Sequence, residues 1–232
     1  MEPMASGDLA GIHGLPMGGE SCQSDSFGEW MAEFSEHSTI FDEAIADHLA
    51  VVQALPRLRP VLEEIATKMA AAIRSGGKIL WCGNGGSAAD SQHLAAELVG
   101  RFRRERRAMP AIALSTDTSI LTAIANDYGY EFVFERQVEA LCRPGDVLVG
   151  ISTSGNSANV CAALASANQL GALTVAFTGE AGGKLAEIAS VALRIPARDA
   201  ARIQECHILC GHIICDWIEQ SVSGRETSNK PS

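Results

Sequence analysis

Short apolar runs alternate with longer segments of helical periodicity over most of this chain. The apolar runs are continuous, as in strands that are buried on both faces, and they cover Lys78–Cys82, Ala111–Leu114, Val147–Ser152, Leu173–Phe177 and Val191–Ile195. The segments between them predict helices at Ala88–Arg101, Tyr130–Cys142, Val160–Leu170 and Lys184–Ala189. The alternation predicts an α/β fold, a doubly wound five-stranded parallel sheet flanked by helices.

Helical patterns also precede the first predicted strand. Apolar positions between Glu29 and Leu55 fit helices loosely, and the pattern resumes over Val61–Ile73 after Pro56 and Pro60. The pair Gly76-Gly77 is expected to end this second helix. The predicted domain therefore carries N-terminal helices ahead of its sheet.

The two ends of the chain differ from its middle. Residues 1–28 are rich in Gly, Ser and Met without periodicity, and we expect a flexible tail there. A last helix is predicted over Ile203–Val222, packed on the sheet or on a partner subunit, and residues 225–232 form a second predicted tail, disordered. We expect residues 29–224 to form a single domain.

Composition narrows the function classes. With 232 residues, 47% of them hydrophobic, the chain can bury one sizeable core. Its formal charge of −10 repels polyanions, so nucleic-acid binding is not expected. One basic cluster runs against this balance, and it predicts either a solvated helix end or loop, or a phosphate contact by one member. The cluster consists of Arg101, Arg103, Arg104, Arg106 and Arg107.

The cysteines and the hydropathy profile suggest a cytoplasmic location. Seven cysteines, an odd number without a CxxC pair, indicate buried reduced thiols rather than a disulfide framework. The first residues lack the basic and apolar regions of a signal peptide, and no run of 18 apolar residues predicts a membrane span.

Ligands of doubly wound folds collect at the carboxyl ends of the strands. Here those ends carry loops rich in glycine and hydroxyl groups, namely 83–87 (GNGGS), 115–119 (STDTS), 152–157 (STSGNS) and 178–183 (TGEAGG). We expect the site among them.

The first of these loops is a glycine corner with more than one interpretation. Residues 83–88 match G-x-G-x-x-A, a weak dinucleotide fingerprint, but the region where a ribose-binding acid is expected holds Arg103 to Arg107. Alternatively the glycines only permit a tight turn, or they aim backbone N–H groups at an anionic ligand.

The loop at 152–157 is more informative, because it has four hydroxyls in six residues where a buried strand gives way to a helix. Such a loop suits a phosphate monoester, whereas an ordinary N-cap accounts for one such residue. Neither G-x-x-x-x-G-K-[ST] nor G-x-S-x-G occurs, which counts against a P-loop NTPase and a serine hydrolase.

Two histidine-containing clusters are candidates for metal binding or acid–base chemistry. His93 and Glu97 are four residues apart and share one helical face. In the terminal helix, helical-wheel geometry places Glu205 closer to His212 than it places Gln204. On geometry alone the preferred pair is Glu205 with His212.

Four segments together resemble one family. GNGGSAADSQH, LTAIANDYGY, GDVLVGISTSGNSANV and ARIQECH followed by GHIICDWIE are similar to the phosphoheptose isomerases, a branch of the sugar-isomerase (SIS) fold. The likeness covers about residues 40 to 222. It implies a cytoplasmic homotetramer with one zinc per subunit that isomerises sedoheptulose 7-phosphate to D-glycero-D-manno-heptose 7-phosphate through an enediol, the first step towards the heptoses of bacterial surface glycans such as lipopolysaccharide.

The resemblance also assigns residues. It implies zinc ligands at His93, Glu97, Gln204 and His212, with Glu97 and His212 moving protons, and so replaces the wheel preference for Glu205. Ala201 stands where some members have an acidic side chain. Arg101 matches an arginine near the sugar phosphate, and the other implied substrate contacts are Asn84, Gly85, Gly86, Asn126, Asp127, Ser152, Thr153, Ser154, Ser157 and Gln204.

The alternative is a non-catalytic SIS protein. Such relatives bind the bacterial replication initiator, or sense a sugar phosphate without converting it. The initiator-binding relatives lack the catalytic Glu and His and replace a glycine of GNGGS, whereas this chain has Gly86, Glu97 and His212 in place. We therefore expect an enzyme.

Overall fold

The computed structural model describes residues 24–223, with the side chains of residues 39–222. The chain divides into two units, residues 1–43 and 44–232, and the boundary lies within helix α1 (Ser24–Ala54). The predicted tails lie outside the described residues except for 24–28, which are helical. The domain limits therefore stay a prediction. The sheet and the helices that cover it all belong to the second unit.

Five parallel strands form one sheet, which confirms the predicted fold class. The order is β2-β1-β3-β4-β5, and every neighbouring pair is parallel. All five occur where the apolar runs predicted them: β1 (Ile79–Gly83), β2 (Ala111–Ala113), β3 (Val147–Ile151), β4 (Leu173–Thr178) and β5 (Val191–Arg194). Every residue of β1 and of β3 is buried, as the continuous apolar pattern requires.

Helices connect and cover the strands. In chain order they are η1 (Leu55–Leu58), α2 (Arg59–Arg74), α3 (Gly86–Val99), α4 (Thr118–Asp127), η2 (Tyr130–Phe132), α5 (Glu135–Leu141), α6 (Ala158–Gln169), α7 (Gly183–Ile188) and α8 (Ala200–Ser223). Pro56 and Pro60 stand in the first positions of η1 and α2, where the missing N–H has no helical partner to lose.

The sequence pattern missed one helix and merged two others. Helix α4 begins where Asp117 accepts a hydrogen bond from the Ile120 N–H at 2.9 Å, a capping arrangement that the hydroxyl-rich loop concealed. The predicted helix at 130–142 is divided into η2 and α5.

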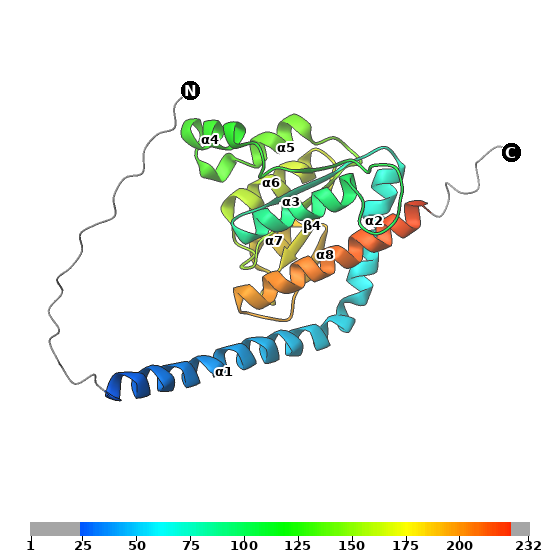
Figure 1. Cartoon of the computed structure of the whole chain (residues 1–232). Coiled ribbons are helices and arrows are strands. Elements are labelled where there is room, and N and C mark those ends of the chain that lie inside the picture. Colours follow the sequence, from blue (N-terminus) through cyan, green and yellow to red (C-terminus); the bar gives the residue numbers. More distant parts are fainter. Residues whose placement is uncertain (1–23, 224–232) are drawn as a thin grey trace, which may run out of the picture. The chain divides into compact units, whose positions relative to one another are not determined.

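The sheet separates two apolar layers because alternate strand residues point to opposite faces. Ile79, Trp81 and Phe177 face the layer under α2, α3 and α8, whereas Leu80 and Leu148 face the layer under α5, α6 and α7. Figure 1 shows α8 running alongside α3 on one side of the sheet.

Six of the seven cysteines lie in the described part of the chain, and none of these six is in a disulfide. Burial raises the pKa of Cys210 and of Cys215 to about 12, so both stay neutral thiols at physiological pH. No helix of the described residues combines the length and apolarity that a membrane span requires.

The strand order places the candidate loops side by side. β1 pairs with β2 on one side and with β3 on the other, so the chain direction across the sheet reverses at the β1–β3 pair. Gly83, which opens the glycine corner, pairs with Ile151, which precedes the hydroxyl loop. Crevices at such switch points are where doubly wound folds bind ligands.

Candidate active site

A cluster of three side chains joins α3 to α8. His93 Nε2 lies 2.8 Å from His212 Nε2 and 3.1 Å from Glu97 Oε1, and one ligand atom from each residue lies within 4.8 Å of the others. Residues 93 and 212 are 119 positions apart in the chain. The structure thus brings together three of the four residues that the resemblance assigned to a metal.

A glycine permits this approach of the two helices. A Cβ on Gly211 would lie 2.6 Å from both methyl carbons of Leu94, so any larger residue there would push α8 away from α3. Because Leu94 follows His93 and Gly211 precedes His212, the contact holds the two imidazoles within reach of each other.

Gln204, the fourth assigned residue, lies against the glycine corner. A Cβ on Gly86 would stand 1.7 Å from Gln204 Nε2, so the absence of a side chain at 86 makes room for the amide. The same amide hydrogen-bonds to Asp90, which lies one helical turn before His93. Gln204 therefore belongs to the same side of α3 as the cluster.

The glycine corner also carries a polar network. Asn84 Nδ2 donates to Asn159 Oδ1 at 2.8 Å, and Asn159 Nδ2 donates back to Asn84 Oδ1 at 2.9 Å. The Tyr130 hydroxyl donates to Asn84 Oδ1 as well, at 3.1 Å. Asn84, an expected substrate contact, is thus oriented by partners from α6 and η2.

The hydroxyl loop is tightly formed. Ser152 Oγ lies 2.9 Å from Ser157 Oγ and 3.4 Å from Ser154 Oγ, directly ahead of the N-terminus of α6. Gly155 has a φ of 68°, and a Cβ there would come within 2.0 Å of the Gly182 carbonyl oxygen. The 178–183 loop consequently braces this hydroxyl loop, whose hydroxyls and backbone amides suit a phosphate.

Asn126, Asp127 and Arg101 make their side-chain contacts elsewhere. Asn126 Nδ2 donates to Asp127 Oδ1 at 2.8 Å, and both side chains are exposed at the end of α4. Arg101 pairs with Glu105 at 3.8 Å just beyond α3. Within the described residues, no hydrogen bond joins these three to the His93 cluster, so their role as substrate contacts stays a prediction.

Comparison with known proteins identifies the family. A model of the SIS domain matches residues 41–179. The chain is 55% identical to the phosphoheptose isomerase of Aquifex aeolicus over 186 residues, which cover 80% of this chain and 96% of that one. The solved phosphoheptose isomerase of Neisseria gonorrhoeae superposes with a TM-score of 0.75 at 46% identity, covering 79% of this chain and 98% of the other. The chain belongs to the phosphoheptose isomerase family. The phosphoheptose isomerase of Roseiflexus sp. is 51% identical over 199 residues, 86% of this chain and 96% of that relative.

The donor set fits the zinc ion that membership of the phosphoheptose isomerase family led us to expect. Two imidazole nitrogens and a carboxylate oxygen are typical zinc ligands, and a catalytic site adds an open position for substrate. A second observation agrees, because Asp90 Oδ2 is buried beside the cluster without a hydrogen-bond partner. His93, Glu97, His212 and the neighbouring Gln204 are the residues that would hold the ion.

Helical-wheel geometry alone paired Glu205, rather than Gln204, with His212, and this prediction is wrong for this member of the phosphoheptose isomerase family. The Glu205 carboxylate accepts from Arg202 Nη2 at 2.6 Å and lies 2.7 Å from His48 Nδ1, while Arg202 also donates to the Ala44 carbonyl. These partners come from the end of α1 and the start of α8. Glu205 is therefore held on the side of α8 that faces residues 44–48 of α1.

Several residues of this phosphoheptose isomerase site were not predicted from the sequence. Asp90 could have been found, since D-x-x-H-x-x-x-E places it, His93 and Glu97 on one helical face. Asn159 and Tyr130 carry no such pattern. Phe102 stacks on His212 with ring centroids 5.2 Å apart, a contact between distant segments.

Burial sets the electrostatics of this centre. It raises the pKa of Asp90 to about 6, although the hydrogen bond from Gln204 and the nearby His93 oppose the shift. Burial also lowers the pKa of His212. His93 and Arg103 lower this pKa further, and Glu97 opposes the shift. The imidazole is consequently neutral near pH 7, the form in which it accepts a proton or binds a metal.

Proposed function

We propose that this chain is an aldose–ketose isomerase that converts D-sedoheptulose 7-phosphate to D-glycero-D-manno-heptose 7-phosphate. The observation that carries the proposal is the His93–Glu97–His212 cluster, together with a loop of converging hydroxyls at the switch point of the sheet. Relatives at about half identity bear the name of this activity.

The reaction moves one proton between C1 and C2 of the sugar through an enediol, and a second between the two oxygens. Such chemistry needs a base and an acid on either side of the reacting carbons. Glu97 and His212 are one carboxylate and one imidazole on different helices that converge on a single point. In this proposal Glu97 exchanges the carbon-bound proton and His212 the oxygen-bound proton.

Zinc, held by His93, Glu97, Gln204 and His212, would polarise the carbonyl and hydroxyl oxygens and stabilise negative charge on them. The remaining work belongs to the chain. Asn84, oriented by Asn159 and Tyr130, presents its amide to the sugar hydroxyls.

The phosphate lies at the far end of a seven-carbon substrate. Ser152, Thr153, Ser154 and Ser157 hold it at the N-terminus of α6, with Arg101 as a further positive group. Binding energy from this remote group orients the reacting carbons against Glu97 and His212. Asn126 and Asp127 complete the proposed substrate contacts.

We further propose that the protein works as a cytoplasmic homotetramer at the start of heptose biosynthesis for lipopolysaccharide. The exposed apolar side chains Ile213, Tyr128 and Phe132 are available for contacts between subunits. The free thiols of the described residues, buried except for the half-buried Cys161, agree with a cytoplasmic location.

The direct test is incubation of purified protein with sedoheptulose 7-phosphate, followed by NMR detection of the aldose. Appearance of the aldose supports the proposal. Binding without conversion would mean a sugar-phosphate sensor, and the absence of both, with capture of the replication initiator in a pull-down, would mean an initiator-binding protein. Either result overturns the isomerase assignment.

A separate measurement tests the metal. Elemental analysis should find about one zinc per subunit, and thorough chelation should remove activity and lower the Tm. The control is His93→Gln, whose Tm should not respond to the chelator. Full activity of the metal-free protein would contradict the assignment.

A further inference from the structure

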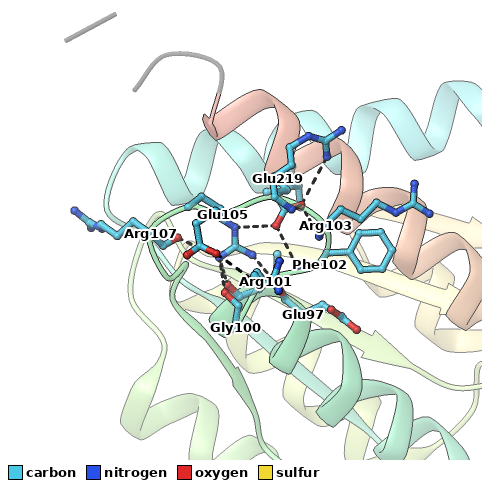
Figure 2. Close-up of polar contacts among 12 residues, drawn as sticks. Glu97, Gly100, Arg101, Phe102, Arg103, Glu105, Arg107 and Glu219 are labelled. Carbon is cyan, nitrogen blue, oxygen red and sulfur yellow. Dashed lines mark hydrogen bonds and ion pairs between the residues drawn. The ribbon is translucent and has the colours of Figure 1, made fainter. Parts of the chain in front are cut away.

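Glu219 is a fully buried carboxylate outside the cluster described above. It lies on α8 two turns beyond His212, and its side chain is 0% exposed. Oε1 accepts from the Phe102 N–H at 3.0 Å, and Oε2 accepts from the Arg103 and Arg104 N–H groups at 2.8 Å each. Figure 2 shows these contacts converging on Glu219 from the turn that follows α3. One side chain of α8 thereby fixes three successive amides of the 102–104 turn.

Arg106 is the buried cationic partner of Glu219, with a side chain that is 2% exposed, whereas Arg104, 3.7 Å from Glu219 Oε2, is 39% exposed. Its Nε donates to Glu219 Oε1 at 3.2 Å. The other end of the same guanidinium reaches the last turn of α3, where Nη2 donates to the Glu97 carbonyl at 2.9 Å and Nη1 to the Leu98 carbonyl at 2.9 Å. Arg106 therefore holds two carbonyls at the end of α3, of which that of Leu98 also accepts from the Met109 N–H at 3.1 Å.

Arg106 and Glu219 each hydrogen-bond to the backbone of a residue in the candidate site. The amide that Glu219 holds at residue 102 belongs to the phenylalanine that stacks on His212. The carbonyl that Arg106 holds at residue 97 belongs to the glutamate of the cluster. Neither Arg106 nor Glu219 is itself among the three clustered residues.

The charge state of the pair suits a rigid support. Burial alone would raise the pKa of the Glu219 carboxyl, but the three backbone N–H groups and Arg106 outweigh it and hold the pKa below its ordinary value. The carboxylate therefore stays ionised at physiological pH. A buried ion pair is seldom the most stabilising choice for a core, so a positional role is a reason to have one.

We propose that Arg106 and Glu219 are positioning residues for the isomerisation, which fix the end of α3 that carries Glu97 and the turn that carries Phe102 relative to His212. The inference rests on the proposed function for its kinetic test only. Guanidinium geometry is essential to it, because three different nitrogens of Arg106 donate to Glu219 and to two carbonyls of α3, whereas a lysine has a single nitrogen.

The experiment compares Glu219→Gln and Arg106→Lys with a matched control, Asp146→Asn. Asp146 is also nearly buried, with a side chain 4% exposed, and it accepts from Lys78 Nζ at 2.6 Å and from the backbone N–H groups of Lys78 and Arg143. It directly precedes β3, at the sheet edge opposite to the candidate site. All three variants lose a buried charge pair or its geometry, and only two of them border the site.

Two readouts separate positioning from plain stability. At a temperature where each variant is folded by circular dichroism, Glu219→Gln and Arg106→Lys should lower kcat roughly 10- to 100-fold with little change in KM. In histidine-labelled protein, both should also shift the ring resonance of His212, assigned with His212→Gln, because the stacked Phe102 ring moves. Asp146→Asn should lower the Tm and leave kcat and the resonance unchanged.

The inference is overturned if kcat and the His212 resonance stay at wild-type values in Arg106→Lys, the variant that keeps the charge. It is also overturned if Asp146→Asn lowers kcat as far as the other two at equal Tm. A wild-type protein without isomerase activity would refute the proposed function, and the His212 resonance would still decide the positioning.

Discussion

Phe102 lies nearly parallel to the imidazole of His212, with ring centroids 5.2 Å apart and planes inclined by 22°. The His212 ring also meets the His93 ring, with centroids 5.0 Å apart and planes inclined by 66°. The imidazole thus contacts one ring from the turn after α3 and one from α3 itself. If His212 transfers a proton as proposed, these contacts orient it before the substrate binds.

Replacing Phe102 should therefore impair the reaction more than the fold. We expect Phe102→Leu to lower kcat by about 10-fold, because the surroundings of a catalytic or metal-binding imidazole typically affect activity on this scale. Steady-state kinetics on the folded variant provide the measurement. The control is Phe102→Tyr, which keeps the stacked ring and should retain kcat. Equal losses in both variants would contradict the stacking argument.

The acid–base assignment of Glu97 and His212 predicts a larger effect. Glu97→Gln and His212→Gln should each lower kcat by about 10²-fold or more, the usual scale for losing a general acid or base. Glu205→Gln is the control, since the Glu205 carboxylate is occupied by Arg202 and His48 on another side of α8. Near-normal turnover in either of the first two variants, or a comparable loss in the control, would refute the assignment.

The close contact between Gly86 and Gln204 predicts a coupled pair of substitutions. Gly86→Ala introduces a Cβ 1.7 Å from Gln204 Nε2 and should displace that amide, lowering kcat by about 10-fold with little change in the free energy of unfolding. In a Gln204→Ala background the same change should cost almost nothing further. Kinetics and urea unfolding of the four proteins complete the cycle, and additive effects on kcat would exclude the mechanism.

His207 predicts a pH dependence of stability. Burial lowers the pKa of this imidazole from 6.5 to about 4, partly opposed by the Thr178 carbonyl that lies 3.2 Å from Nε2. Nδ1 is buried without a partner, so a proton there would have no acceptor. Below pH 6.5 His207 is protonated in the unfolded chain, whereas in the folded chain it stays neutral until about pH 4. The free energy of unfolding therefore falls as the pH is lowered from 6.5 to about 4.

The free energy of unfolding should fall by about 3 kcal/mol between pH 6.5 and pH 4 because of His207. Urea unfolding of the wild type at pH 7 and pH 4.5 measures it. His207→Gln keeps a donor for the Thr178 carbonyl and cannot be protonated, so its stability should fall less over the same range. Parallel curves for the two proteins would show that His207 does not titrate as described.

The fold was predictable because its determinants are local. Runs such as Val147–Ile151 are apolar without interruption. Such a pattern fits a strand that is covered on both faces, and the run is too short for a buried helix. Helix α4 escaped prediction because its apolar residues follow a loop rich in hydroxyls and none of its residues is buried. The loops after β1 and β3 were predictable as a site, since parallel strands end at one edge of the sheet.

The membership of the site depended on tertiary packing. The sequence by itself determined the α3 face that carries His93 and Glu97, because helical spacing is a property of one segment. Which face of α8 meets it was decided by the contact of Gly211 with Leu94, by the space that Gly86 leaves for Gln204, and by the His48 and Arg202 partners of Glu205. The contacts of Phe102, Arg106 and Glu219 could not be predicted for the same reason. They join segments over a hundred residues apart or close a turn of irregular backbone, and no periodicity of the sequence indicates such contacts.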